Sequence, residues 1–382
     1  MKILIIAANV GKTAPGIVFE RLIQELCKTH EIDILTSDLD PLLDISAAKN
    51  IFEIKRKTFH HRIPKLLISL FGINPLDVFW SKNAVSKLVT AQHHYDLILS
   101  FISFHNYAPL IAGSLALDKL SSKLAVYSVD AIPAPIGWSV NDSYFRQVKN
   151  MMAKYLAKAD FFFSANEQML NYQLGTFKPK KKLVVDVVFN PNGGKLTDLQ
   201  TDGMAEPYFL YTGGIYQVRK PDYILKAFEK LLIKYPSAKM VFVGTVLTPA
   251  ALSLISQHTL DSIQFMPFAK DLNDYYKRAT ALIDIDADIE NDVFLSSKMV
   301  SYLEINRVII SETGKNSPSR RLFSNIESII QCDHDAGQLC DAMERSIKLN
   351  NKLSFQDRQL VLKEFSVETV VNKLNKILTD HS

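Results

Sequence analysis

Cysteine, glycine and proline are all scarce in this chain. Its 382 residues include three cysteines, 14 glycines and 15 prolines. Three scattered cysteines are too few for a disulfide framework or a zinc site, and they favour a reducing compartment. The low glycine and proline content excludes collagen-like and low-complexity chains.

Long hydrophobic runs are also missing. No apolar stretch approaches the roughly 18–20 residues that a membrane-spanning helix needs. The first one, residues 3–8, is too short for a signal peptide and has no convincing cleavage site. We therefore expect a cytoplasmic protein.

Two common phosphate-binding signatures are incomplete or absent. Gly11-Lys12-Thr13 matches the end of a P-loop, but that loop needs a glycine five positions earlier, where the chain has Ile6. No GxGxxG motif follows the first predicted strand of either half. The sequence therefore supports neither a P-loop ATPase nor a dinucleotide-binding protein.

Charge is nearly balanced overall but unevenly distributed. The formal net charge is +4, yet residues 1–190 hold 22 basic and 16 acidic side chains, which makes the rest slightly acidic. A positive half can meet an anionic lipid surface or phosphorylated substrate, or can be an ordinary solvated surface. Because the basic residues are not interleaved with aromatics along one face, we expect no nucleic-acid partner.

Short apolar runs alternate with amphipathic stretches along the first half of the chain. The runs predict strands at residues 3–7, 31–36, 97–101, 124–128, 161–164 and 183–185. After the first run, Val18, Leu22 and Leu26 recur at four-residue spacing, which predicts a helix against a sheet. Nearly continuous apolar strands are typical of a parallel sheet that is covered on both faces.

The same alternation begins again in the second half. Strands are predicted at residues 208–212, 239–243, 263–266, 281–285 and 308–311. Ile224, Ala227, Phe228 and Leu231 lie at helical spacing between the first two of these strands. A last helix is predicted at residues 367–378, with Ser366 as its N-cap.

These patterns predict an α/β fold with two Rossmann-like, doubly wound parallel-sheet domains of similar size. We place the first domain at residues 1–190, a linker at 191–207 and the second domain at 208–365. The terminal helix, within residues 366–382, is expected to pack back on the first domain. In such sheets ligands bind at the carboxyl ends of the strands, so we expect the site where the two domains face each other.

Two helix starts in the second half carry cations. Gly213-Gly214 is followed by Arg219-Lys220 before an amphipathic helix, and Ser296-Ser297-Lys298 precedes another apolar run. Glycines let backbone approach a ligand, and helix N-termini with nearby cations hold phosphate. The alternative interpretation of each is a surface turn with solvated cations. Together, at strand ends of one domain, they favour a diphosphate site.

An acidic cluster follows the strand predicted at residues 281–285. Asp284, Asp286 and Asp288 share one face of an extended chain, so a divalent ion is geometrically possible there. The alternative is a buried strand whose acidic end meets solvent or a cleft. We favour the alternative and predict no metal site.

The order and spacing of several second-half segments resemble the donor domain of family 4-like GT-B glycosyltransferases (glycosyl transferases group 1). The segments are residues 211–215, 219–221, 224–228, 241–244, 265–267, 297–299 and 308–309, with Phe365-Ser366 before the last helix. The resemblance covers nearly the whole chain and is stronger after residue 205. It implies a nucleotide-sugar bound by the second domain and an acceptor bound by the first.

The activity implied by the resemblance is transfer of a sugar from a nucleoside diphosphate to a glycan or lipid-linked acceptor, in polysaccharide or glycoconjugate synthesis. The transfer would retain the anomeric configuration and need no metal or other cofactor. The alternatives are a nucleotide-sugar epimerase of the same fold, which needs no acceptor, and a non-catalytic glycan-binding or assembly subunit.

The resemblance also implies a set of donor-binding residues. Arg219 matches the family's basic diphosphate contact, Gly214 replaces a neighbouring arginine, and Gly16 matches the glycine whose amide faces the phosphates. The full set is Gly16, Gly213, Gly214, Arg219, Lys220, Thr245, Met266, Glu290, Asp292, Ser297, Lys298 and Ser301.

Two residues of the first half are predicted to be catalytic. His105 follows the strand at 97–101, near the place of a family histidine that lies close to the sugar. Asp130 ends the strand predicted over residues 124–129 and could accept the proton of the acceptor hydroxyl. The alternatives are a packed or solvated histidine and an aspartate that caps a turn.

The chain departs from the family at its glutamate pair. Many members carry two glutamates eight positions apart, and these positions hold Val293 and Ser301 here. Asp292 or Glu290 could replace the first, and Ser301 could still hydrogen-bond a ribose hydroxyl. The missing pair is what supports the non-catalytic alternative.

A basic segment adjoins an apolar one at residues 55–71. Lysine, arginine and histidine side chains precede the run at residues 66–71. This pattern suits peripheral binding to an anionic membrane on its cytoplasmic face, and then the acceptor would be lipid-linked. The alternative is a core helix with a solvated basic flank.

Overall fold

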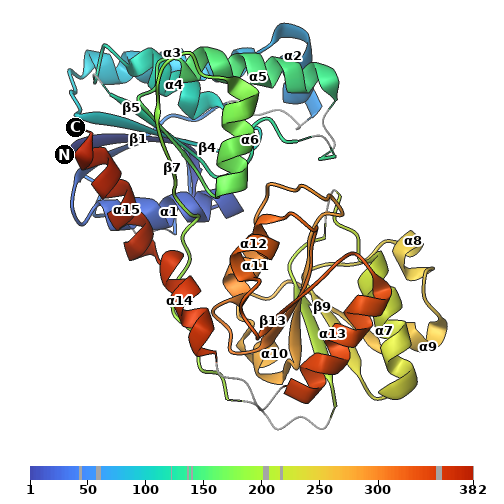
Figure 1. The fold of residues 1–382 in the computed structure, drawn as a ribbon. Helices are drawn as coiled ribbons and strands as arrows, with labels where there is room; N and C mark the ends of the chain where they lie inside the picture. Colours follow the sequence, from blue (N-terminus) through green and yellow to red (C-terminus); the bar gives the residue numbers. More distant parts are fainter. Residues whose placement is uncertain are drawn as a thin grey trace. The chain divides into compact units, whose positions relative to one another are not determined.

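The chain forms two compact units in the computed structural model (Figure 1). The first comprises Met1–Asn192 together with Phe365–Ser382, and the second Gly193–Glu364. The structure describes residues 1–42, 45–56, 62–121, 123–135, 137–138, 141–200, 206–215, 218–349 and 355–381. Each unit has one parallel sheet with helices packed against it, which confirms the predicted fold class.

The sheet of the first unit has strands in the order β3-β2-β1-β4-β5-β6-β7, with every pair parallel. They are β1 (Lys2–Val10), β2 (Glu31–Leu39), β3 (Asn50–Glu53), β4 (Leu97–Ile102), β5 (Leu124–Ser128), β6 (Phe161–Ser164) and β7 (Val184–Val187). β3 was not predicted from the sequence. This four-residue edge strand alternates between partly buried and exposed residues, so its apolar signal is weak.

Alternate residues of β1 serve two separate cores. Ile3 and Ile5 pack in the cluster that contains α1 (Ala14–Leu26) and α15 (Val367–Asp380). Leu4 and Ile6 belong to the other face. The helices on that side are α3 (Pro75–Thr90), α4 (Ala108–Ala116), α5 (Asp142–Leu156) and α6 (Glu167–Phe177), and α2 (Arg62–Phe71) contacts α5. Burial on both faces explains why the sequences of these strands are nearly continuous apolar runs.

The sheet of the second unit has the order β10-β9-β8-β11-β12-β13, again all parallel. Its strands are β8 (Tyr208–Thr212), β9 (Lys239–Val243), β10 (Ile263–Met266), β11 (Ala281–Ile285), β12 (Val308–Glu312) and β13 (Ile329–Cys332). Five of them lie where the sequence predicted strands, and β13 was missed.

The helices of the second unit lie on both faces of its sheet (Figure 1). On one face α7 (Asp222–Lys234) and α13 (Ala336–Leu349) pack against each other and the strands. On the other, α10 (Asn273–Arg278) contacts β8, and α11 (Ser297–Tyr302) contacts β11. The remaining helices are α8 (Pro249–Leu252), α9 (Gln257–Leu260), α12 (Pro318–Phe323) and α14 (Gln356–Glu364).

The segment expected to be a linker is divided between the units. Residues 191–192 belong to the first unit, whereas Gly194 donates its amide to Glu304 at 2.8 Å and Leu199 to Asn306 at 3.2 Å, within the second. Residues 201–205 lie outside the described residues. The chain returns to the first unit at Phe365, and α15 packs on α1. Ser366 caps α15 by accepting the amide of Thr369, as predicted.

Each strand order reverses once, and the reversal marks where a ligand can bind. In the first unit it lies between β1 and β4, and in the second between β8 and β11. The loops leave in opposite directions at such a point, which opens a crevice at the carboxyl ends of the strands.

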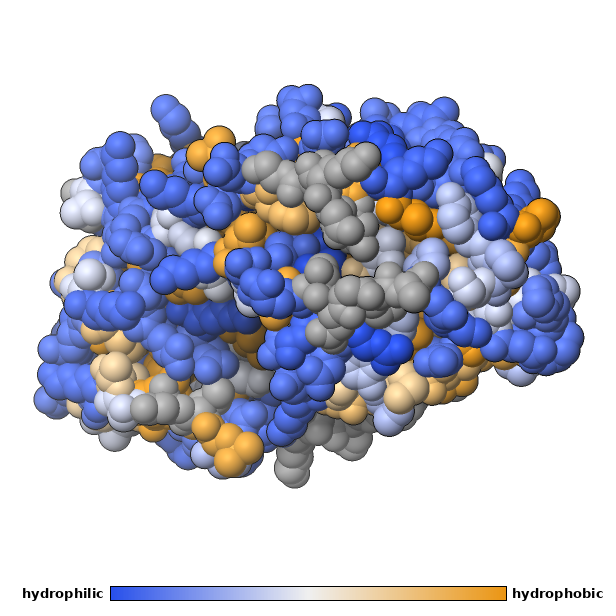
Figure 2. All heavy atoms as spheres, turned by 90° about the horizontal axis from the view of Figure 1, so that it is seen from below, coloured by the Kyte–Doolittle hydropathy of each residue, from blue (hydrophilic) through white to orange (hydrophobic). Residues whose placement is uncertain are grey.

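Within the described residues, no single helix is long and apolar enough to cross a membrane. The segments Ile63–Phe71 and Pro75–Thr90 pass that test only together, by length and composition, and they meet at a bend of 91°. The face of the molecule in Figure 2 is mostly hydrophilic, with hydrophobic residues in small separate groups.

Candidate functional site

The reversal point of the second unit brings two predicted cations together with two carboxylates. Arg219 precedes α7 and Lys298 lies in the first turn of α11, while Asp284 and Asp286 come from the end of β11 and just after it. Arg219 Nη2 lies 3.4 Å from Asp286 Oδ1, and the side chain of Arg219 is only 9% exposed. A backbone bridge between Arg219 and Ala287 holds this pair in place.

Both aspartates of this cluster are buried and have protein partners. Asp284 Oδ1 accepts a hydrogen bond from Ser296 Oγ at 2.8 Å, and Asp286 accepts from Arg219 and from the amide of Ala287. Burial raises the pKa of each carboxyl group; the charge of Arg219 opposes that rise for both, and the charge of Lys298 opposes it for Asp284. The aspartates thus balance the two cations.

Lys298 lies over an aromatic ring beside the backbone of a glycine. Its Nζ is 4.7 Å from the centre of the Tyr211 ring. A Cβ added at Gly213, whose φ is +81°, would be 3.5 Å from that Nζ. Burial lowers the pKa of Lys298 to about 8, although the neighbouring Asp284 favours the charged form. The ammonium is therefore poorly solvated, which favours an anionic ligand.

A second buried charge pair adjoins this cluster and was not predicted from the sequence. Glu312, the last residue of β12, pairs with His334, whose Nδ1 lies 2.8 Å from Glu312 Oε1. Burial raises the pKa of Glu312 to about 7. Burial lowers the pKa of His334, but its bond to Glu312 outweighs this and leaves that pKa above its usual value.

The other predicted donor-binding residues of this unit have no comparable charge contacts. Thr245 and Met266 follow β9 and end β10, at the same sheet edge, and both are half-buried. The exposed members of the set are Gly214, Lys220, Glu290, Ser297 and Ser301. Ser301 Oγ donates to the Ser297 carbonyl at 3.1 Å, within its own helix.

Asp292 is turned into the protein. It is 1% exposed, and its Oδ1 accepts the amides of Val293 at 2.8 Å and Phe294 at 3.4 Å. This carboxylate orders the turn before α11. If Asp292 takes the place of the first family glutamate, it does so while holding this turn.

In the first unit, Gly16 lies at the start of α1 directly after β1. Its amide donates to Thr13 Oγ1 at 3.1 Å, the N-cap contact of that helix. A Cβ at this position would lie 2.5 Å from Asn9 Oδ1. A side chain here would displace Asn9, and the amide predicted to face phosphate is used inside the loop.

His105 lies in the loop after β4 with a φ of +65°, a left-handed conformation that few non-glycine residues adopt. Its Nδ1 is 2.6 Å from Tyr144 Oη, which is 2.8 Å from Tyr107 Oη. Burial holds the pKa of both tyrosines above the usual value. Strained backbone supported by a buried network is typical of functional loops.

Asp130 lies beside this loop, after β5. Its Oδ2 accepts the amide of Phe104 at 2.9 Å, which ties together the ends of β4 and β5. Burial raises the pKa of its carboxyl group. A carboxylate with a raised pKa is suited to proton exchange, and it also orders the loop that carries His105.

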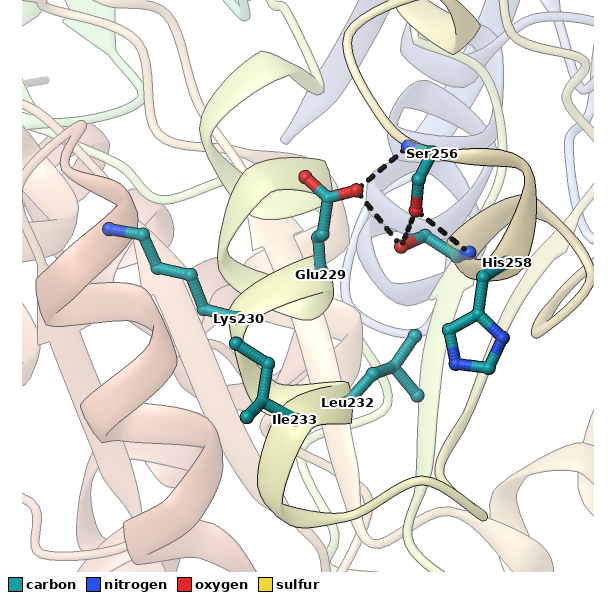
Figure 3. Close-up of a pocket in the computed structure, with 7 residues that line it drawn as sticks. Glu229, Lys230, Leu232, Ile233, Ser256 and His258 are labelled. Carbon is teal, nitrogen blue, oxygen red and sulfur yellow. Dashed lines mark hydrogen bonds between the residues drawn. The ribbon is translucent and has the colours of Figure 1, made fainter.

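A surface pocket of about 350 Å³ lies away from these groups, between α7 and the segment that leads into α9 (Figure 3). Its carboxylate, Glu229, points toward Ser256 and accepts that residue's amide at 2.7 Å and the hydroxyl of Thr259 at 3.2 Å. These bonds hold the start of α9, so this carboxylate has a structural role in the pocket.

Among the residues that the structure describes, no group of three or more His, Cys, Asp or Glu side chains is arranged to hold a metal ion. Asp284 and Asp286 instead take serine and arginine as partners. The sequence motif that suggested a divalent ion is thus part of an ion-pair network.

The sequence matches none of the protein-family models or curated protein sequences with which it was compared. Its fold does match solved structures, and the chain has the two-domain GT-B fold, as predicted. A glycosyltransferase from Rickettsia africae ESF-5 has a TM-score of 0.68 at 11% identity, covering 99% of this chain and 98% of that one.

Two further structures are similar over the same length. Anabaena Alr3699/HepE, in complex with UDP and glucose, has a TM-score of 0.65 at 13% identity and covers 99% of each chain. The lipopolysaccharide outer core galactosyltransferase WaaB, in its apo form, has a TM-score of 0.63 at 13% identity and covers 100% of each chain.

Proposed function

We propose that this protein transfers a sugar from a nucleoside diphosphate sugar to a glycan or lipid-linked acceptor, with retention of configuration and without a metal. The observation that supports this proposal most is the pair of largely buried cations, Arg219 and Lys298, at the reversal point of the second sheet. The HepE complexes with UDP and with UDP-glucose, which share the fold, support a nucleotide-sugar as the ligand.

The proposed chemistry follows from where charge develops. The leaving nucleoside diphosphate gains negative charge as the glycosidic bond breaks, and Arg219 and Lys298 would stabilise it in place of a metal ion. On the first unit, His105 and Asp130 would contact the sugar and the acceptor hydroxyl. The sheet edges that carry these residues are those where the GT-B fold leaves room for ligands.

The first test is binding followed by transfer. We expect one nucleoside diphosphate among UDP, GDP and ADP to raise the melting temperature with EDTA present, because a ligand at 100 times its Kd adds about 2.7 kcal/mol of stability. The matching nucleotide-sugar should then release nucleoside diphosphate only when an acceptor extract is added. Conversion of the nucleotide-sugar into another nucleotide-sugar without acceptor would favour the epimerase. The absence of any melting-temperature shift would favour the non-catalytic subunit.

Nucleotide binding should depend on pH through Lys298. Because its pKa is lowered to about 8, the ammonium loses its proton as the pH rises from 7 to 9, and affinity for the nucleoside diphosphate should fall. Calorimetric titrations at pH 7 and 9 measure this change. Lys298→Arg should lose most of the pH dependence, since arginine stays charged throughout this range. A wild-type affinity equal at both values would contradict the assignment.

We further propose that α2 contacts an anionic membrane that carries the acceptor. Leu66, Leu70 and Phe71 are 57%, 63% and 66% exposed on this helix. Of the predicted basic flank, Arg56 pairs with Asp77 at 3.0 Å and its side chain is 15% exposed, whereas residues 57–61 lie outside the described residues. Vesicles with anionic lipid should sediment the protein, and Leu70→Glu with Phe71→Glu should abolish this.

A further inference from the structure

The imidazole of His334 connects three elements at the edge of the second sheet. Its Nδ1 lies 2.8 Å from Glu312 Oε1 on β12, and its Nε2 lies 3.0 Å from the carbonyl oxygen of Ala287, after β11. His334 itself follows β13. All three residues are largely or fully buried, since the side chains of His334 and Glu312 are 9% and 1% exposed and Ala287 is 0% exposed.

The partners of this imidazole fix where its protons are. A carbonyl oxygen can only accept, so Nε2 must carry a proton toward Ala287. A carboxylate faces Nδ1, so one further proton is shared between Nδ1 and Oε1. The pair therefore holds two protons and has no net charge. Its burial leaves no charge that Arg219 or Lys298 would have to balance.

Ala287 connects the imidazole of His334 to the proposed diphosphate site. Its backbone forms an isolated antiparallel bridge with Arg219, and its amide donates to Asp286 Oδ1 at 3.0 Å. The same carboxylate oxygen lies 3.4 Å from Arg219 Nη2. The position of Ala287 thus sets both the backbone and the ion-pair partner of Arg219.

Other charged and aromatic groups face the pair without replacing it. Asp288, exposed after β11, favours the charged form of His334 and disfavours that of Glu312. Asp284 on β11 also disfavours ionised Glu312. From α7, the ring of Tyr223 lies 6.0 Å from the imidazole, centre to centre. The carbonyl oxygen of Ala287 accepts from His334 Nε2 and also from the amide of Ile289 at 2.8 Å.

We propose that His334, held by Glu312, is a positioning residue for Arg219 in binding the diphosphate of the nucleotide-sugar. This inference rests on the proposed function. His334 does not touch the ligand in this scheme. It fixes Ala287, and Ala287 fixes the guanidinium that meets the phosphates. Neither partner of the pair was singled out by the sequence resemblance.

A double-mutant cycle tests the proposal, with calorimetric titration of UDP, GDP and ADP into the full-length protein. His334→Leu removes both donors and should weaken binding of the preferred nucleotide about tenfold. In an Arg219→Met background the same change should have no further effect, because His334 acts through Arg219. Glu312→Gln should stay close to wild type, since an amide can donate to Nδ1 and leave the Nε2–Ala287 bond intact.

The control is His258→Leu, which removes an exposed imidazole on α9. If His334→Leu is poorly folded, His334→Gln, which keeps one donor, takes its place in the cycle. Equal losses for His334→Leu in both backgrounds, or no loss in the wild-type background, would overturn the proposal while nucleotide binding stands. A wild-type protein that binds none of the three nucleotides would instead remove the proposed function, and this inference with it.

Discussion

Replacing Lys298 by methionine should weaken binding of the nucleoside diphosphate by about 10- to 100-fold, the value of one or two hydrogen bonds to a charged group. Methionine keeps most of the side-chain length over the Tyr211 ring but removes the charge. Fold and stability should change little, because Lys298 is itself poorly solvated where it lies. Titration calorimetry at pH 7 measures the change.

The matched control for this experiment is Lys226→Met. Lys226 is exposed on α7, in the same unit. The Lys226→Met variant should bind nucleotide with the affinity of the wild type at the same ionic strength. If both variants lost affinity equally, the effect would be a general loss of positive charge, and the assignment of Lys298 as the phosphate contact would fail.

Arg358→Met should be the most destabilising single substitution that we predict, at about 3 kcal/mol or more. Arg358 is 0% exposed in α14. Its guanidinium donates to the carbonyls of Ile305 at 2.6 Å, Arg307 at 3.0 Å and Ser328 at 3.0 Å. Methionine fills similar volume but leaves these carbonyls without that donor, and buried unsatisfied groups are costly.

The loss should be confined to the second unit. Hydrogen exchange is the appropriate readout because a chain with two units need not unfold in one step. The amide of Ile309, bonded to the carbonyl of Ser328 at 2.9 Å, should exchange faster in Arg358→Met, whereas β1 should be unchanged. Arg345→Met, at an exposed position of α13, is the control. Equal protection in all three proteins would show that the buried guanidinium contributes little.

The fold was predictable because it depends on patterns that local sequence carries. Strands with both faces buried are apolar at nearly every position, and β5, β6 and β8 begin and end at the predicted residues. The two strands that were missed, β3 and β13, are short, and polar residues interrupt their apolar runs: Asn50 and Glu53 are the ends of β3, and Gln331 lies within β13. The helix caps were predictable for a similar reason, since Ser296 and Ser366 bond amides three residues away.

The candidate site was only half visible in the sequence. Arg219 and Lys298 could be found because each begins a helix after a strand, a local signal that the family resemblance reinforced. Their charge partners could not be assigned, because Asp286 is 67 residues from Arg219 along the chain. In the sequence, the same aspartates have only two interpretations, a geometrically possible metal site and, the one we favour, the acidic end of a buried strand. Only the strand order, which sets β11 beside β8, shows that they balance cations.

What the sequence by itself determined is the α/β class, the repeat of that pattern in two halves and the cations at two helix starts. The tertiary structure decided which groups meet. Glu312 and His334, 22 residues apart, form a buried pair because β12 and β13 are neighbours. Hydrophobic periodicity is a property of the local sequence, whereas the contacts of a charged side chain depend on which strand ends lie next to each other in the sheet.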